Sequence, residues 1–330
     1  MSNITFCPCG KDLAYKKCHG ARHASNLWVF GEFSVCALDD TQSIVEGGQV
    51  PLQPVHSDSK TWTGLCISHR ATREFAKSLF ATSAKWRDLL DVQELHWYKI
   101  HGSRNLGEKR IEAIEAFLEI LEALDQDDFV ILRQTAYGGN RSDTHNANNW
   151  VAGTPESISL YQTSLHYFQF EPFTGSPTAN QLARAGLLLK LASAIKNRGW
   201  RAAKVFIDGG GDLPTEGEVS LLQSPELLRL LSGPLCIVDS SKNDLVQLVD
   251  LISFMLRRFQ DFVITSAGGG DKELNRFDYS LAERGIYQRF SDLVTVEQEI
   301  GFFSYDIDTD SRKIINVKGM FQDDSTSSAT

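Results

Sequence analysis

Three aspartates stand at positions from which a folded chain could bring them to one edge of a sheet. Asp39 and Asp208 each stand at the end of an apolar, strand-like run, V-C-A-L-D-D and V-F-I-D, and Asp250 lies in the helical stretch Q-L-V-D-L. A carboxylate at such a place rarely has a packing role, whereas several together supply the oxygen ligands that Mg²⁺ and Mn²⁺ prefer. If one α/β fold collects all three, they predict a divalent-metal site.

Each of these aspartates also has an ordinary interpretation. Asp39 could start a turn, as Asp often does after a strand, and the glycines that follow Asp208 suit a plain turn as well as a close ligand. Asp250 is the most informative, because an Asp between Val249 and Leu251 costs free energy unless it is paired or coordinating. Its alternative is a place on the solvent side of the helix. Asp40 should point away from Asp39, so it is the weaker candidate ligand.

Three further residues are candidates for the same site. Glu94 could be a fourth carboxylate and His96 an acid or a phosphate contact, although both could equally belong to a plain strand surface. Lys242 follows two serines and could contact a phosphate, or could simply be exposed near the start of the next helix. With the three aspartates they form the predicted catalytic set.

A second metal site is expected near the N-terminus. Cys7, Cys9, Cys18 and His19 offer three thiolates and one imidazole, the composition of a closed structural zinc site. The spacing, the Pro-Cys-Gly step and the Lys16–Lys17 pair resemble the SEC-C motif, a short zinc-binding module. Such a knuckle has no core of its own, so zinc would supply its folding free energy. Its role could be docking to a protein or nucleic acid, or purely structural.

Apolar periodicity predicts an α/β fold, because runs of strand formers alternate with segments of helical spacing. We expect strands over 33–40, 61–68, 92–100, 129–135, 203–208 and 235–239. Helices are expected over 71–90, 107–124, 178–198, 224–231 and 243–259. Beyond these we expect a helix over 278–290 and a hairpin of 302–307 with 313–317.

Four short motifs follow one another between residues 33 and 260. They are Asp39-Asp40-Thr41-Gln42, Glu94-Leu95-His96-Trp97, Phe206-Ile207-Asp208, and Asp239-Ser240-Ser241-Lys242 leading into Gln247-Leu248-Val249-Asp250-Leu251. In this order they resemble a widespread bacterial family of uncharacterised ribonuclease H-like domains. That family has an Asp-Glu-Ser-Gly strand motif and a Gln-Leu-Ala-Asp-Leu helix motif. The departures are Asp40 for Glu, Gln42 for Gly, and His96 where Lys is common.

The resemblance implies a ribonuclease H-like mixed sheet flanked by helices, in which carboxylates of the first strand, the fourth strand and a later helix hold two metal ions. We therefore expect a SEC-C-like zinc knuckle over 1–22 and a ribonuclease H-like domain over 33–260 with an insertion near 70–125. A C-terminal extension over 261–320 and a disordered tail over 321–330 complete the expected organisation.

The composition of the chain bears on its partners and its cellular location. The net charge of −9 over 330 residues argues against a broad basic surface for duplex binding. No apolar run approaches a membrane span and no signal peptide is evident, so we expect a cytoplasmic protein without membrane contact. Six cysteines in such a chain indicate metal ligands or plain core and not disulfides, and Cys36, Cys66 and Cys236 should be core.

Two classes of function follow. The first is a metal-dependent nuclease that hydrolyses phosphodiester bonds of RNA or single-stranded DNA with Mg²⁺ or Mn²⁺, with zinc serving only structure. Because the chain is acidic, we expect it to bind nucleic acid weakly alone, with help from the knuckle or a protein partner. The second is a non-catalytic binding or regulatory protein on the same scaffold, recruited through its zinc knuckle. The distance between the three aspartates discriminates the two.

Overall fold

The computed structural model describes residues 30–41, 60–136, 150–152, 179–209, 217–219, 229–233, 235–266, 275–294 and 302–304. The predicted zinc ligands Cys7, Cys9, Cys18 and His19 lie outside these residues. So do the expected tail, most of the helix expected over 224–231, and the second half of the expected hairpin. Among the helices that the structure describes, none combines the length and the apolar character that a bilayer crossing requires.

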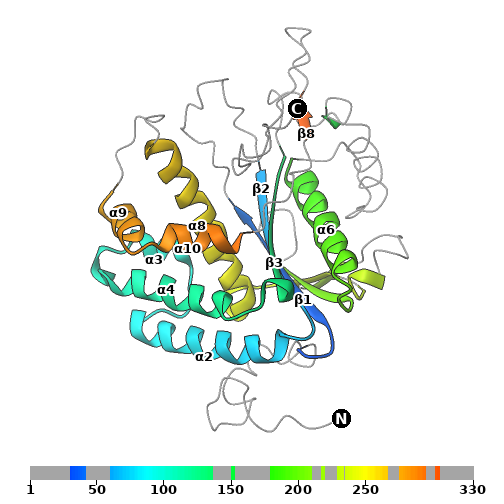
Figure 1. Ribbon diagram of the computed structural model, residues 1–330, viewed down its shortest axis with the longest axis horizontal. Helices are drawn as coiled ribbons and strands as arrows, with labels where there is room; N and C mark the ends of the chain where they lie inside the picture. The colour runs from blue at the N-terminus through cyan, green and yellow to red at the C-terminus, as the bar shows by residue number, and fades with distance from the viewer. Residues whose placement is uncertain are drawn as a thin grey trace, which may run out of the picture.

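A mixed six-stranded sheet, flanked by helices, forms the centre of the fold (Figure 1). Its strand order is β3-β2-β1-β5-β7-β6, with β1–β3 antiparallel, β5 parallel to β1, β7 parallel to β5, and the short β6 antiparallel at the edge. The strands are β1 (Ser34–Thr41), β2 (Lys60–Ile67), β3 (Phe129–Ala136), β5 (Ala203–Asp208), β6 (Gly217–Val219) and β7 (Leu235–Val238). The α/β prediction is therefore confirmed.

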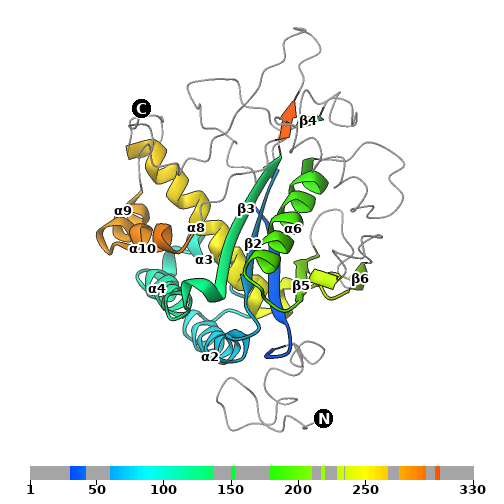
Figure 2. The same ribbon diagram turned by 45° about the vertical axis from the view of Figure 1, so that its right-hand side comes forward.

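Two layers of helix cover the sheet (Figures 1 and 2). α6 packs on β2 and β3 on one face, and α8 packs on β1 and β2 on the other, with the remaining helices gathered around α8. The helices are α2 (Thr72–Leu90), α3 (Trp97–Gly102), α4 (Lys109–Glu122), α6 (Ala179–Asn197), α8 (Asp244–Ser266), α9 (Arg276–Glu283) and α10 (Ile286–Leu293).

Strand alternation decides which side chain meets which layer. In β1, Val35 and Ala37 belong to the apolar core shared with α8, whereas Cys36 and Leu38 belong to the core shared with α6. Successive side chains of a strand point to opposite faces, so both faces of β1 are buried. An apolar run without polar alternation is what such a central strand requires.

The predicted strand over 92–100 is wrong. That segment is an irregular connection that leads into α3, which begins at Trp97. Trp97 and Ile100 are buried, and a spacing of three residues places both on one side of a helix. Instead of pairing with a strand, the segment lies across α8 and bonds to its side chains, because the backbone N–H groups of Leu95 and Trp97 donate to Gln247 and Asp250.

The C-terminal strand also pairs differently from the prediction. β8 (Phe302–Ser304) is antiparallel to β4 (Trp150–Ala152), in a separate two-stranded sheet. The helix expected over 278–290 is present as α9 and α10, which are separated at Gly285, where φ is +66°. The helix expected over 243–259 continues to Ser266.

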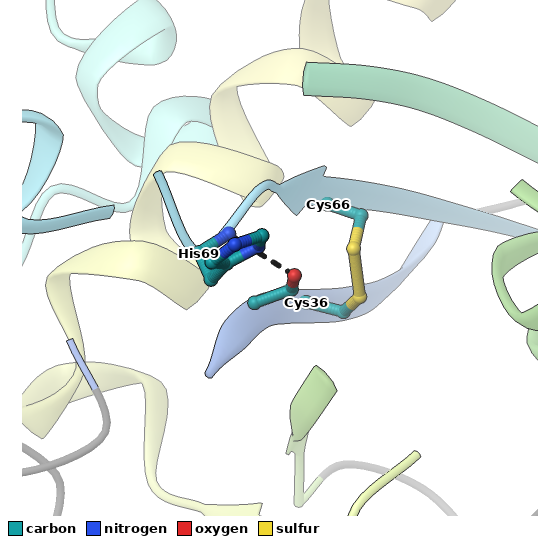
Figure 3. Close-up of a disulfide and its surroundings, with 4 residues drawn as sticks. Cys36, Cys66 and His69 are labelled. Atoms are coloured by element: carbon teal, nitrogen blue, oxygen red, sulfur yellow. Dashed lines mark hydrogen bonds between the residues drawn. A yellow bond between two sulfur atoms is a disulfide. The ribbon is translucent and has the colours of Figure 1, made fainter. Parts of the chain in front are cut away.

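The expectation that the core cysteines are unpaired is wrong for two of them. Cys36 of β1 stands directly opposite Cys66 of β2, and the two form a disulfide with a Cα–Cα distance of 4.1 Å (Figure 3). Both side chains are fully buried, as predicted, and Cys236 is the free cysteine among the described residues. The prediction used the expected cellular compartment, whereas strand register brings these two thiols together.

Candidate metal centre

Asp39 and Asp208 lie at the same end of two neighbouring parallel strands. The register pairs Leu38 of β1 with Ile207 of β5, so the next residue of each strand is an aspartate at the same level. Two residues earlier, Ala37 and Phe206 both belong to the core shared with α8. Because side chains alternate along a strand, Asp39 and Asp208 point to that same face, the face that α8 covers.

Asp40 joins these two residues. Carboxylate oxygens of Asp39, Asp40 and Asp208 all lie within 4.8 Å of one another. Asp39 is buried, with 6% of its surface exposed, whereas Asp208 is partly buried and Asp40 is exposed. The expectation that Asp40 is the weaker candidate rested on strand alternation. Here the oxygens of neighbouring aspartates nevertheless approach at the strand end, and we define these three residues as the carboxylate group.

Burial and mutual repulsion dominate the electrostatics of the carboxylate group. Burial, and next the negative charges of Asp250 and Asp208, hold the pKa of Asp39 well above its ordinary value. Burial, and next the charge of Asp40, raises the pKa of Asp208 to about 6. A buried carboxylate with like-charged neighbours favours any change that adds positive charge, either a proton or a cation.

Backbone donors partly offset this repulsion at Asp208. The N–H groups of Gly209 and Ser240 lie close enough to its carboxylate to lower the pKa that burial has raised. Gly209 directly follows β5, and Ser240 lies just beyond β7, the next parallel strand. The loops that leave two neighbouring strands therefore orient the same carboxylate.

Asp250 faces the carboxylate group from α8 but is not part of it. Its side chain is 16% exposed, and its Oδ2 atom accepts a hydrogen bond from the N–H of Trp97 at 3.0 Å and lies 3.1 Å from Nδ1 of His96. Its charge nevertheless raises the pKa of Asp39 and that of Asp208. Asp250 thus lies near the other two predicted aspartates, while its Oδ2 atom contacts Trp97 and His96.

Glu94 and His96 both lie beside the site, on the connection before α3. The hydrogen bond to Asp250 raises the pKa of His96 above its ordinary value of 6.5, against the opposing effect of burial. The carboxylate of Glu94 accepts a hydrogen bond from Oγ of Ser240 at 2.9 Å. Glu94 therefore contacts the loop that also orients Asp208, and is held near the site by that loop.

Of the predicted residues, Lys242 has the surroundings that least fit a catalytic cation. It ends the short 3₁₀ turn Ser240–Lys242, and its Nζ atom lies 3.2 Å from Oδ2 of Asp239. Its side chain is half exposed. Asp239 also accepts hydrogen bonds from the backbone and hydroxyl of Ser241, so this ion pair stabilises the turn that carries Ser240.

Gln247 is a site residue that the sequence prediction did not include. Its Oε1 atom accepts hydrogen bonds from the N–H of Leu95 at 3.2 Å and from Arg87 at 3.3 Å, and its Nε2 donates to the carbonyl of Ser240 at 2.7 Å. Gln247 is buried and stands one helical turn before Asp250. That spacing, which puts both side chains on one side of the helix, was the available signal.

Comparison with known proteins adds little to this geometry. No family model and no curated protein matches the chain. One solved structure matches, described as the PCNA:RNase HII complex from Archaeoglobus fulgidus; the match covers 84% of this chain and 100% of that one, at 14% identity and a TM-score of 0.29. A similarity of that size does not establish a shared fold.

Proposed function

We propose that the chain is a metal-dependent nuclease that hydrolyses phosphodiester bonds of RNA or single-stranded DNA. The observation that supports this most is the meeting of Asp39 and Asp208 at neighbouring strand ends, with Asp40 beside them. The fold gives further support, because a mixed sheet flanked by helices is what the family resemblance implies. Asp39, Asp208 and Asp250 come from the elements that the resemblance names.

The carboxylate group fits a hard divalent cation. Its donors are all oxygens, within 4.8 Å of one another, and Mg²⁺ and Mn²⁺ bind through one or two carboxylates plus phosphate oxygens. In the part of the chain that the structure describes, no lysine or arginine pairs with Asp39 or Asp208. A cation held there would stabilise the negative charge of a phosphodiester and of the attacking water during hydrolysis.

The remaining residues would position the substrate. Protonated His96 would donate from Nδ1 to Asp250, and its Nε2–H could then donate to another acceptor, such as a phosphate oxygen. The raised pKa of His96 keeps a larger share of the ring in that charged form near neutral pH. Glu94, fixed by Ser240, provides a further carboxylate at the rim of the site.

Cleavage and metal binding can be tested in one set of proteins. Purified wild-type chain should degrade a single-stranded RNA or DNA with Mn²⁺ and not with EDTA, and Asp208→Asn should abolish cleavage. Mn²⁺ should also raise the melting temperature of the wild type and not that of Asp208→Asn. Glu74→Gln, an exposed change on α2, serves as the control. Cleavage that persists in the Asp208→Asn/Asp250→Asn double variant would refute the proposal.

A second candidate is a non-catalytic binding or regulatory protein. The observation in its favour is that Asp250 bonds to Trp97 and His96, a structural use of a carboxylate that the nuclease hypothesis assigns to metal. This candidate predicts that Mn²⁺ leaves the melting temperature unchanged and that nucleic acids are not cleaved.

We propose separately that Cys7, Cys9, Cys18 and His19 bind a structural zinc ion. Three cysteines and one histidine at these positions supply a complete tetrahedral shell. The test is the zinc content of purified protein by mass spectrometry, which should be one ion per chain and should be lost in Cys7→Ser/Cys9→Ser. A wild-type protein without zinc contradicts the proposal.

A further inference from the structure

The surface next to Asp250 is formed by α3 lying against α8. One turn beyond Asp250, the ring of Phe254 packs edge-to-face with Tyr98, with centroids 5.5 Å apart. Near the next turn, Arg257 donates a hydrogen bond to the hydroxyl of Tyr98 at 3.1 Å. Asp250 and Arg257 are seven residues apart, so both lie on one side of α8, about 10 Å apart along its axis. Tyr98 and Arg257 thus lie beyond Asp250 along α8, with the buried Phe254 packed against Tyr98.

This surface carries two cationic side chains, Lys99 and Arg257, beside the contact between His96 and Asp250. His96 bonds to Asp250 and has a side chain 37% exposed. Lys99 is exposed and lies close enough to His96 for its charge to act on that ring. The guanidinium of Arg257 lies over the ring of Tyr98, 5.7 Å from its centroid. We call Tyr98, Lys99 and Arg257 the cationic strip.

The two cations of the cationic strip, Lys99 and Arg257, form no ion pair within the part of the chain that the structure describes. Lys99 has no ion-pair partner among the described residues, and Arg257 has Tyr98 as its polar contact there. Asp261, one turn farther along α8, lies beside Arg258. The neighbouring arginines behave differently, because each is paired with a carboxylate: Arg258 with Asp278, Arg284 with Glu108 and Glu115, and Arg289 with Glu122.

A lysine and an arginine without ion-pair partners among the described residues are unexpected at such a place in a chain of net charge −9. A row of cations with an aromatic ring among them is the combination with which proteins bind single-stranded nucleic acids, because the cations contact phosphates and the ring can stack on a base. Because one short helix and one side of another form the strip, we expect it to fit one strand and not the two backbones of a duplex.

We propose that the cationic strip binds the phosphate backbone of a single-stranded nucleic acid and leads it past the carboxylate group. The inference rests on the proposed function, since it names the substrate class of that site. An acidic peptide would be attracted by the same charges but would gain nothing from the ring of Tyr98 beside them.

The test measures binding in EDTA, where no cleavage occurs. Full-length protein is titrated into a fluorescently labelled single-stranded oligonucleotide over a series of salt concentrations. Lys99→Gln/Arg257→Gln should weaken binding by about 10-fold and reduce the slope of log affinity against log salt by about 1.4, since each lost phosphate contact removes about 0.7. Lys77→Gln, the control for each single substitution, removes one positive charge from an exposed, paired position of α2 and should change neither quantity.

Single substitutions guard against a folding defect. Lys99→Gln alone changes an exposed side chain and should give about half of the change in slope, and Lys99→Arg should restore wild-type binding. Unchanged affinity and slope in the double variant overturn the proposal. Equal affinity for duplex and single strand overturns it too, as does displacement of the oligonucleotide by polyglutamate at matched charge.

The two proposals fail in distinguishable ways. Strip-dependent binding in EDTA without any Mn²⁺-dependent cleavage supports the cationic strip and refutes the nuclease. Mn²⁺-dependent cleavage with an unchanged KM in Lys99→Gln/Arg257→Gln supports the nuclease and refutes the cationic strip.

Discussion

The Nδ1 atom of His96 lies 3.1 Å from the Oδ2 atom of Asp250. The hydrogen bond between them is the largest cause of the raised pKa of His96, and burial of the ring acts in the opposite direction. Asp250 therefore determines the charge of a ring that stands between the carboxylate group and the cationic strip. This contact leads to a first prediction, which concerns the titration of His96.

The pKa of His96 should lie above 6.5 in the folded protein and should fall in Asp250→Asn. A raised folded-state pKa means that the interaction stabilises the fold fully below the ordinary pKa of 6.5 and that this stabilisation is lost as pH rises through the folded value. The measurement is a histidine NMR titration. His69, whose pKa is lowered by burial and by Arg201, is the internal control and should not respond. An unchanged His96 titration in Asp250→Asn would contradict the pairing.

Asp208→Asn should stabilise the metal-free protein at neutral pH. The folded-state pKa of Asp208 is about 6, above the ordinary 3.8, so the folded state binds the proton more tightly and stability falls as pH rises between about 4 and 6. Above that window the charged side chain costs on the order of 1–3 kcal/mol, which the amide avoids. Urea unfolding in EDTA over a pH series measures the difference, which should vanish in acid.

Asp239→Asn is the matched control, because it should change stability at neutral pH in the opposite direction. The pKa of Asp239 is lowered, first by the hydrogen bond from Ser241, so its charge stabilises the fold above the ordinary pKa and this stabilisation is lost as pH falls through the lowered value. Asp239→Asn should therefore reduce stability at neutral pH. A reduced stability in both variants would show that backbone donors outweigh repulsion at Asp208.

Much of the fold could be predicted because most of its helices and strands have clear apolar patterns in the sequence. The strand ending in Asp39 and the strand ending in Asp208 are apolar on both faces, and the structure places them within a residue or two of the expected ranges. The segment around Trp97 could not be predicted, because nine residues with apolar positions at both two- and three-residue spacing fit a strand as well as a helix. Hydrogen bonds to α8 decide between them.

The site was less predictable than the fold. Alternation predicted that Asp40 points away from Asp39. Strand register cannot be read from the local pattern, so neither the approach of Asp40 nor the opposition of Cys36 and Cys66 could be anticipated. Such contacts depend on which residues become neighbours across strands, and a single sequence does not display that.

The Cys36–Cys66 disulfide should stabilise the isolated protein. It closes a loop of 30 residues, for which chain-entropy arguments give about 3–4 kcal/mol. Urea unfolding with and without reductant should differ by that amount, and Cys36→Ala/Cys66→Ala should be insensitive to reductant. Cys236→Ala, which changes the free cysteine, should keep the sensitivity. Alkylation of both Cys36 and Cys66 in unreduced, denatured protein would show that the bridge is absent in solution.

Gln247→Leu should destabilise the protein by about 2–4 kcal/mol. Gln247 bonds to the N–H of Leu95 and the carbonyl of Ser240, and each buried group left without its partner costs about 1–3 kcal/mol. The connection that carries Glu94 and His96 loses one of its attachments to α8, so the pKa of His96 should move toward 6.5 as its contact with Asp250 loosens.

Gln288→Leu separates this effect from the loss of any glutamine. Gln288 is exposed on α10 and bonds to Asp292, so its replacement should change stability by no more than about 0.5 kcal/mol. In Gln247→Glu the acceptor for Leu95 remains, but the carboxylate faces the carbonyl of Ser240 without a donor, so stability should fall without restoring the wild-type titration of His96. If Gln247→Leu lowers stability while the pKa of His96 stays at its wild-type value, Gln247 stabilises the core without positioning the site.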